Sequence, residues 1–493
     1  MESLKHRAIN SIMWFGSSRL VSLIITWAVS LLLVRILSPQ DFGLVAMGMS
    51  YVSIIEIFYD FNIGFAILQK ADLTEEETHS CFWFMLGGIT FWYAISWFLA
   101  KAVAAFYQSE QLTFLVRIMM LGLVFQGVSG VPFWLLTKKL DFSKRAKATM
   151  WAAIPSTIIT LVLALKGLGV LALALRFVFF NFFFCVFLYG YFPWRPKLMF
   201  RLSALRSILT FSLSVTGFRF FRYAATKCDN IIIGKFLGAE LLGYYRVALE
   251  FSRIPIDRGI VLLNQVSFPV YAELQNDLLR LKDYFLKISR YILFLALPIF
   301  LGAAVMAHEA FRMILGERWL AVVPIFQIMC FASIPEALVG NLVSLNNAVG
   351  KPNRNLAFSL VAAVALTGGF LVAVRFGLVG VAAVWVTIYP LVFVFFLRGS
   401  LNLIQSSLLE FFKTASISIV GSLGMALAVL TFQNVVPILR NSLSGSSFLV
   451  LFGGCVYVLF FLIFDREFMK DVQGIFRGFL WAKVLGRQNT RES

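Results

Sequence analysis

The sequence predicts an all-α integral membrane protein of about fourteen transmembrane helices, and three observations lead to this fold class. Hydrophobic residues make up 60% of the 493 positions and charged residues only 14%, which lies outside the range of ordinary soluble domains. Apolar stretches recur at about 20 residues, the length at which an α-helix crosses roughly 30 Å of hydrocarbon. The alternating strands of about ten residues that build a membrane β-barrel are not recognisable in the sequence.

Apolar runs between polar residues place the predicted spans in order along the chain. The first run, about residues 9–34, is too long for the core of a signal peptide and is expected to remain as a helix. Short connections such as "LSPQD" and "LGAE" contain the Pro and Gly residues that tight turns need. The spans are expected to begin near residues 9, 41, 80, 112, 148, 169, 206, 239, 288, 320, 355, 378, 412 and 446.

A repeat indicates that the chain is a duplicated half-protein. The motif "RILSPQDFG" starts at Arg35, and "KFLGAELLG", with similar residue types in the same order, starts 200 positions later at Lys235. Each copy joins an odd-numbered span to an even-numbered one, around Ser38 and Gly238, so the halves are expected to be parallel repeats. The predicted domains are an N-lobe with six spans (1–193), a pseudo-symmetric C-lobe with six spans (194–400), and two extra spans with a basic tail (401–493).

The distribution of basic residues predicts the orientation in the membrane. Lys and Arg concentrate in the even-numbered connections, for example "TKKLDFSKRAK" and "WRPKLMFRLSALR", and such loops stay in the cytoplasm. Both termini are therefore expected there, and much of the +18 net charge is explained without a nucleic-acid partner. The five cysteines and three histidines are scattered, so we expect no metal site, no cofactor and no enzymatic activity.

Several charges fall inside the predicted spans, where each costs about 3 kcal/mol or more at the bilayer centre and so needs a role. Arg19 and Arg219 are again 200 positions apart. Counting back from each turn, Arg19 should lie level with the region of Glu56 and Asp60, and Arg219 level with Asp257.

A charged stripe is predicted on the eighth span. Arg246, Glu250, Arg253 and Asp257 follow one another at intervals of four, three and four residues, which places them on one helix face. Such a face would be too costly in lipid and is expected to line a water-filled cavity between the halves.

These charges define the candidate site. Pairing within the protein is an open alternative for the acids, but bases outnumber acids in the spans, and a cationic cavity favours an anionic cargo. The predicted substrate-binding residues are Arg19, Arg219, Arg222, Lys227, Arg246, Arg253 and Arg258. The predicted ion-pair or coupling residues are Glu56, Asp60, Asp229, Glu250 and Asp257.

Four motifs carry a resemblance to a known family: "RILSPQDFGLVAM", "DNIIIGKFLGAELLGYYRVALEF", "ILGERW" and "LDFSKRA". With them the chain resembles the polysaccharide-transport branch of the multidrug/oligosaccharidyl-lipid/polysaccharide (MOP) superfamily, the Wzx-type flippases. The resemblance implies two lobes in a V, with spans one, two, seven and eight lining the cleft. It also implies a bacterial inner-membrane protein that moves undecaprenyl-pyrophosphate-linked oligosaccharide for exopolysaccharide, capsule or O-antigen synthesis, among membrane lipids and beside a polysaccharide polymerase.

Three alternative functions remain to be weighed. A lipid II-type flippase would share a basic cavity, although the turn motifs favour the polysaccharide branch. The drug-exporting (MATE-like) branch uses a carboxylate in its first span, whereas this chain has Arg19 and no acid there. A membrane glycosyltransferase normally needs a sizeable loop with catalytic groups, and the connections here are short.

Overall fold

Helices account for the regular structure of the described chain. The computed structural model describes residues 26, 28–59, 63–70, 72–139, 141–436 and 442–474. Every regular element within these ranges is a helix, which confirms the all-α fold class.

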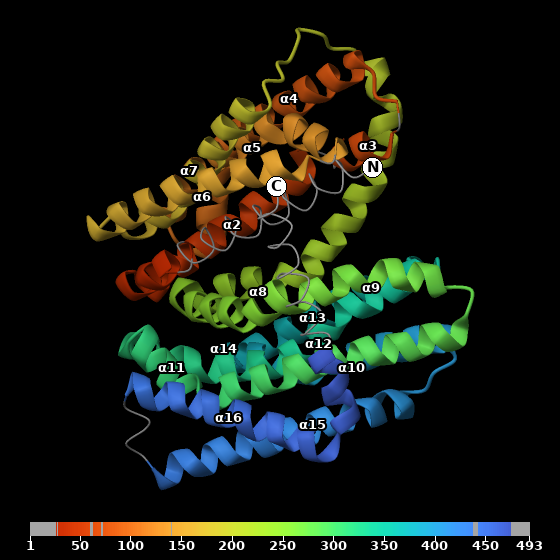
Figure 1. Cartoon of the computed structure of the whole chain (residues 1–493). Helices are drawn as coiled ribbons and strands as arrows, with labels where there is room; N and C mark the ends of the chain where they lie inside the picture. The colour runs from red at the N-terminus through yellow and green to blue at the C-terminus, as the bar shows by residue number, and fades with distance from the viewer. Residues whose placement is uncertain are drawn as a thin grey trace, which may run out of the picture. The chain divides into compact units, whose positions relative to one another are not determined.

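The helices follow one another with short connections (Figure 1). The described chain up to residue 191 forms α2 (Pro39–Tyr59), α3 (Ile63–Gln69), α4 (Glu75–Tyr107), α5 (Gln111–Lys138), α6 (Phe142–Leu165) and α7 (Gly169–Tyr191). The middle of the chain forms α8 (Leu202–Pro255), the π-helix η1 (Ile256–Ile260), α9 (Val261–Leu274), α10 (Leu278–Val305), α11 (Ala307–Ile314) and the 3₁₀-helix η2 (Glu317–Val322). The remainder forms α12 (Val323–Ala348), α13 (Asn353–Ala373), η3 (Val374–Phe376), α14 (Gly377–Leu401), η4 (Asn402–Ile404), α15 (Leu408–Val435) and α16 (Leu443–Phe464).

Ten segments of the described chain are long and apolar enough to cross a membrane. One of them, Asn353–Ile404, contains both α13 and α14. Large apolar side chains also stay exposed on the helices, among them Phe98 at 77%, Val364 at 76% and Leu391 at 71%, as expected for a surface that meets lipid rather than water. The chain is a multi-pass membrane protein. The count of fourteen spans remains a prediction, because most of the first span lies outside the described residues and α8, where two spans were expected, is not among the ten segments.

The two repeated turns are built by different chemistry at the same place in the motif. Ser38 caps α2: its hydroxyl accepts from the Asp41 backbone N–H (3.2 Å), while the Asp41 carboxylate accepts from the Ser38 N–H (2.9 Å). This reciprocal pair, followed by Pro39 in the first turn, is a helix start signal. In the second copy Gly238 breaks α8 with φ 86° and ψ 177°, a conformation that favours glycine. The predicted turn at Gly238 is confirmed as a break between two helices.

The first compact unit contains the described residues up to Val247, together with Ile314–Val322 and Ser359–Val384. In its bundle α5 packs against α2, α3, α4 and α7, and α6 packs against α7 (Figure 1). The connection before α8 is tied to the start of α4, because Lys197 pairs with Glu75 (2.6 Å) and Arg201 with Glu76 (3.0 Å). In the sequence, the basic residues Lys197 and Arg201 were assigned only to setting the orientation in the membrane. In the structure they also link this connection to α4.

The second compact unit contains Ala248–Met313, Val323–Phe358 and the described residues from Trp385 onward. Here α10 packs against α9, α12, α15 and α16 (Figure 1). The two predicted extra spans, α15 and α16, share a core with α10 in which Tyr457 and Phe461 pack against Phe294. These units reflect packing, whereas the predicted lobes reflect the sequence repeat, so the domain boundaries at 193 and 400 remain a prediction.

Candidate functional site

The predicted cationic site falls partly outside the described part of the chain. Arg19 and Asp60 are not among the described residues. Arg219 and Arg222 belong to α8, but their side chains are not described. The predicted pairing of levels, Arg19 with Glu56 and Arg219 with Asp257, therefore stays a prediction.

The remaining predicted cations and acids of α8 and of the π-helix η1 that follows it differ in exposure. Lys227 and Arg246 are half-buried. Glu250, Asp257 and Arg258 are exposed. The regular spacing of the stripe ends at Pro255, where the chain enters the π-helix Ile256–Ile260. Because a π-helix has a wider turn than an α-helix, the angles between side chains change beyond Arg253, and a single charged face that includes Asp257 stays a prediction.

Asp229 is a fixed, buried carboxylate in the first unit. Its side chain is 1% exposed and accepts hydrogen bonds from the Tyr245 hydroxyl (2.6 Å) and the Asn230 backbone N–H (2.8 Å). A buried carboxylate is tolerated when its oxygens are bonded in this way. Within its own unit, this predicted ion-pair or coupling residue is held by neutral donors.

Glu56 is likewise hydrogen-bonded to a neutral group. The Gln126 amide on α5 donates to the Glu56 carboxylate on α2 at 2.7 Å. This hydrogen bond connects α2 and α5, the predicted second and fourth spans, within the first unit. The sequence suggested basic partners for Glu56 and did not identify Gln126.

Arg253 pairs with a carboxylate that the sequence analysis overlooked. Its Nη2 atom lies 3.9 Å from Oε1 of Glu336 on α12, and the two side chains are 26% and 34% exposed. The Tyr389 hydroxyl donates to the other Glu336 oxygen. All three residues belong to the second unit, and a small cavity lies beside the pair, lined in part by Trp385. The sequence did contain a signal for this pair, because Glu336 is an acidic residue in the middle of the predicted tenth span.

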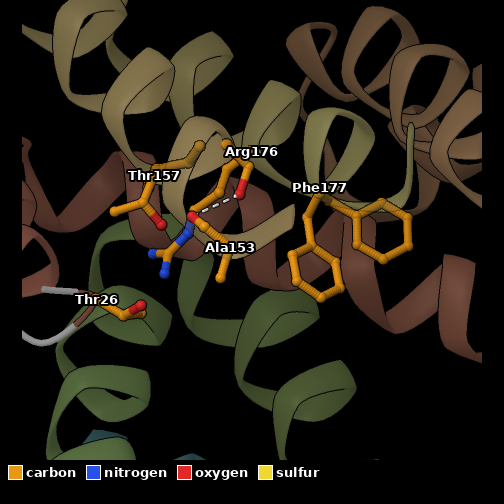
Figure 2. A pocket seen from close by; sticks show the side chains of 8 residues that line it. Thr26, Ala153, Thr157, Arg176 and Phe177 are labelled. Carbon is orange, nitrogen blue, oxygen red and sulfur yellow. Dashed lines mark hydrogen bonds between the residues drawn. The ribbon is translucent and has the colours of Figure 1, made fainter. Parts of the chain in front are cut away.

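A larger cavity lies in the first unit around Arg176, another residue outside the predicted set. Its volume is about 310 Å³, and it is lined by residues of α6 and α7 and by Thr26. Figure 2 shows Arg176 with Thr157 on one side of the view and the ring of Phe177 on the other. The Arg176 Nη2 atom donates to the Ser30 hydroxyl at 3.5 Å. The signal in the sequence was a single arginine within the apolar run "LALALRFVFF".

Two arginine side chains of the described chain, Arg176 and Arg253, lie beside cavities. Arginine side chains beside cavities provide planar donors for carboxylate or phosphate oxygens. Among the described residues, no cluster of three or more His, Cys, Asp or Glu side chains is arranged to hold a metal ion.

Comparison with known proteins identifies similar sequences over most of the chain. Residues 32–324 match the family described as "Polysaccharide biosynthesis protein". The chain is 23% identical to an "Uncharacterized membrane protein in cps region" of Klebsiella pneumoniae, covering 97% of this chain and 99% of that protein. It is 24% identical to the "Lipopolysaccharide biosynthesis protein WzxC" of Escherichia coli (strain K12), covering 71% of this chain and 70% of the relative.

The fold is similar to that of a solved transporter. The structure titled "Lipid II flippase MurJ, inward closed conformation" matches with a TM-score of 0.77 and 13% identity, covering 93% of this chain and all of the other chain. At this identity the match concerns the fold alone. The resemblance that the sequence motifs suggested is confirmed.

Proposed function

This chain belongs to the polysaccharide biosynthesis protein family, and we propose that it translocates lipid-linked oligosaccharide repeat units across the bacterial inner membrane. The observation that carries the proposal is the family match over residues 32–324 on a chain whose fold is that of a helical transporter. The cargo would be a polyprenyl-pyrophosphate-linked oligosaccharide destined for exopolysaccharide, capsule or O-antigen. A polysaccharide polymerase on the receiving side would be the partner protein.

Cations inside the spans support an anionic cargo. Arg19, Arg219 and Arg222 would bind the pyrophosphate oxygens, and Lys227, Arg246 and Arg258 would extend the positive field. Arginine suits this role because its fork can hold two phosphate oxygens at once. Arg253, which pairs with Glu336, would add less to the field than the sequence suggested, since its charge is partly offset.

Alternating access would move the cargo. A cavity that opens to one side of the membrane at a time can pass a charged head group while the apolar polyprenyl chain stays in lipid. Binding energy from the head group offsets the cost of taking its charge out of water. Loading would take place from the cytoplasmic leaflet, and both termini would lie on that side of the membrane.

A translocation assay tests the proposal directly. Purified protein is reconstituted in liposomes that contain a fluorescent polyprenyl-pyrophosphate oligosaccharide, and an external glycosidase reports how much cargo reaches the outer leaflet. We expect cleavage beyond the half that is initially exposed, at a rate that depends on the protein. Protein-free liposomes and liposomes with lipid II as cargo are the controls.

The same assay separates the alternatives. Faster movement of lipid II than of the oligosaccharide cargo would favour a lipid II-type flippase. Formation of a new glycosidic bond from a sugar donor would indicate a membrane glycosyltransferase, and movement of a cationic drug without movement of either lipid would indicate a drug exporter.

A further inference from the structure

The connection between α7 and α8 is an irregular segment that covers residues 192–201. Pro193 and Pro196 lie within it. Proline has no backbone N–H and favours extended backbone in the residue before it, so this stretch continues neither helix. The segment also joins the two halves of the predicted repeat, because α7 ends the first half and α8 begins the second.

Hydrogen bonds fasten the backbone of this segment to the first turns of α4. The Lys197 backbone N–H donates to His79 Nδ1 (3.1 Å), and the Trp83 indole N–H donates to the Lys197 carbonyl oxygen (2.8 Å). The Arg201 backbone N–H donates to the Ser80 hydroxyl (3.0 Å). Together with the ion pairs that the Lys197 and Arg201 side chains form with α4, these bonds fix the course of the segment.

The fixed segment leaves large apolar side chains uncovered. Leu198 is 90% exposed and Phe200 is 57% exposed, and Leu202 at the start of α8 is 62% exposed. Because the backbone on both sides of Leu198 and Phe200 is bonded to α4, these side chains cannot turn inward without breaking those bonds. A group of exposed apolar side chains of this kind marks a contact with another protein or with a membrane.

The surroundings of the segment are those of a membrane–water interface. The segment follows α7, which is long and apolar enough to cross a membrane. Trp83 donates a hydrogen bond to it, and Trp194 within it stacks on His79 with the ring centroids 5.3 Å apart. Tryptophan is enriched at the level of the lipid head groups, and the basic residues of this connection predict the cytoplasmic side.

Cations near the segment favour anionic head groups. Arg195 is exposed. Lys139 Nζ lies 5.1 Å from the centre of the Phe192 ring, and Arg145 Cζ lies 4.2 Å from the centre of the Phe133 ring. Basic residues next to the end of a span are attracted to the anionic lipids of the cytoplasmic leaflet. A protein partner would need no such position at the end of a span, so the observations favour lipid.

We propose that residues 194–202 form an anchor on the membrane surface. Leu198, Phe200 and Leu202 insert at the boundary between the head groups and the acyl chains, and Arg195 binds anionic head groups. The occupant is phospholipid of the leaflet that is predicted to be cytoplasmic. Because the segment is fastened to α4, insertion would hold α4 and the start of α8 at one depth in the bilayer. The inference goes beyond the proposed function and does not depend on the identity of the cargo.

Photo-crosslinking in the full-length protein tests the anchor. Leu198 and Phe200 are each replaced by the photoreactive p-benzoylphenylalanine, and the protein is irradiated in nanodiscs that contain phosphatidylglycerol and phosphatidylcholine. Mass spectrometry then identifies the molecules attached at each position. We expect phospholipid adducts at both positions, as at Phe98, an exposed residue of the apolar helix α4. Glu110, an exposed residue between α4 and α5, is the matched control and should give few lipid adducts.

The same adducts report the preference for anionic lipid. At Leu198 the ratio of phosphatidylglycerol to phosphatidylcholine should exceed the ratio at Phe98 by up to about fivefold, since a cation near an anionic surface contributes about 1 kcal/mol. Arg195→Gln should remove most of this enrichment. Arg398→Gln, which alters an exposed arginine of α14 in the other unit, should leave it unchanged.

Several results would overturn the inference. Peptide adducts in place of lipid at Leu198 and Phe200 would mean that protein covers the segment. A lack of adducts at both positions, when Phe98 gives lipid adducts, would mean that the segment faces water. Lipid adducts as frequent at Glu110 as at Leu198 would mean that the contact is not specific to this segment. Enrichment of phosphatidylglycerol that persists in Arg195→Gln would contradict the role given to Arg195.

Discussion

Gly43 packs directly against the backbone of Ala239, so closely that a Cβ atom on Gly43 would lie 1.6 Å from the Ala239 carbonyl oxygen. The contact is reciprocal: a Cβ on Gly243 would lie 1.8 Å from the carbonyl oxygen of Pro39. Both pairs come from the repeated motif and are related by the same offset of 200 positions. Each copy of the motif therefore supplies a glycine that allows the backbone of the other copy to approach closely. This contact gives a physical reason for a glycine at the same place in both copies.

We expect Gly43→Ala and Gly243→Ala to lower the yield of folded protein and the midpoint of thermal unfolding in detergent. The added methyl group would overlap a carbonyl oxygen, and the backbones would have to separate. Gly87→Ala on α4 is the matched control, since no atom lies within 4 Å of the position its Cβ would take. A Gly43→Ala variant as stable as Gly87→Ala would show that the two turns do not stay in contact.

The buried carboxylate of Asp229 should depend on Tyr245. Replacing Tyr245 with Phe removes the 2.6 Å hydrogen bond to Asp229 and should reduce the free energy of unfolding by about 1 to 3 kcal/mol, because the carboxylate loses a buried donor. The neighbouring Tyr244→Phe variant is the control: it removes an exposed bond to Glu240 (3.2 Å). Chemical unfolding of each variant in detergent measures the difference. Equal losses in the two variants would contradict the buried role of Asp229.

The Arg253 and Glu336 pair should show coupling in a double-mutant cycle. Glu336→Leu alone leaves the Arg253 charge without this carboxylate, whereas Arg253→Leu combined with Glu336→Leu removes both charges. Because both side chains are partly exposed, the coupling is expected to be about 1 kcal/mol rather than the larger value of a fully buried pair. Thermal unfolding of the wild type, both single variants and the double variant measures it. Strictly additive effects would mean that the pair contributes nothing to stability.

Length and composition of the apolar runs were enough to predict the helical membrane fold, and the Pro and Gly of the repeated motif predicted both turns. The first residues of the helices were predicted less well, because a helix can extend beyond the hydrocarbon layer. The ninth span was expected to begin near residue 288, whereas the corresponding helix, α10, begins at Leu278. The polar first turns of such helices carry no apolar signal, so hydropathy marks the part in lipid and not the whole helix.

Contacts between distant side chains were not predictable from the spacing of charges along one helix. Arg253 was assigned to a stripe with its neighbours on α8, yet its carboxylate partner, Glu336, lies on α12. The Glu56 contact with Gln126 joins positions 70 residues apart. The Arg176 cavity depends on how α6 and α7 pack, and nothing in the local sequence around Arg176 identifies Ser30 or Thr157 as its neighbours.

The repeated arginines provide the sharpest test of cargo recognition. If Arg219 binds a pyrophosphate, Arg219→Ala removes charge-assisted hydrogen bonds worth roughly 1.5 to 3 kcal/mol each. Export of polymer should then fall by one or two orders of magnitude, since about 1.4 kcal/mol corresponds to a factor of ten. Arg219→Lys should recover part of the loss, because an ammonium keeps the charge but lacks the planar fork.

Export is measured in cells that lack the native protein, and the amount of each variant in the membrane is measured in parallel. Lys413→Ala is the control, because Lys413 is an exposed cation of α15 outside the predicted site and its loss should change export little. Arg19→Ala should behave like Arg219→Ala, since the repeat relates the two positions, and the double variant should lose more than either one. Normal export by well-expressed Arg19→Ala and Arg219→Ala variants, alone and combined, would mean that these arginines are structural and that the cargo is held by other residues.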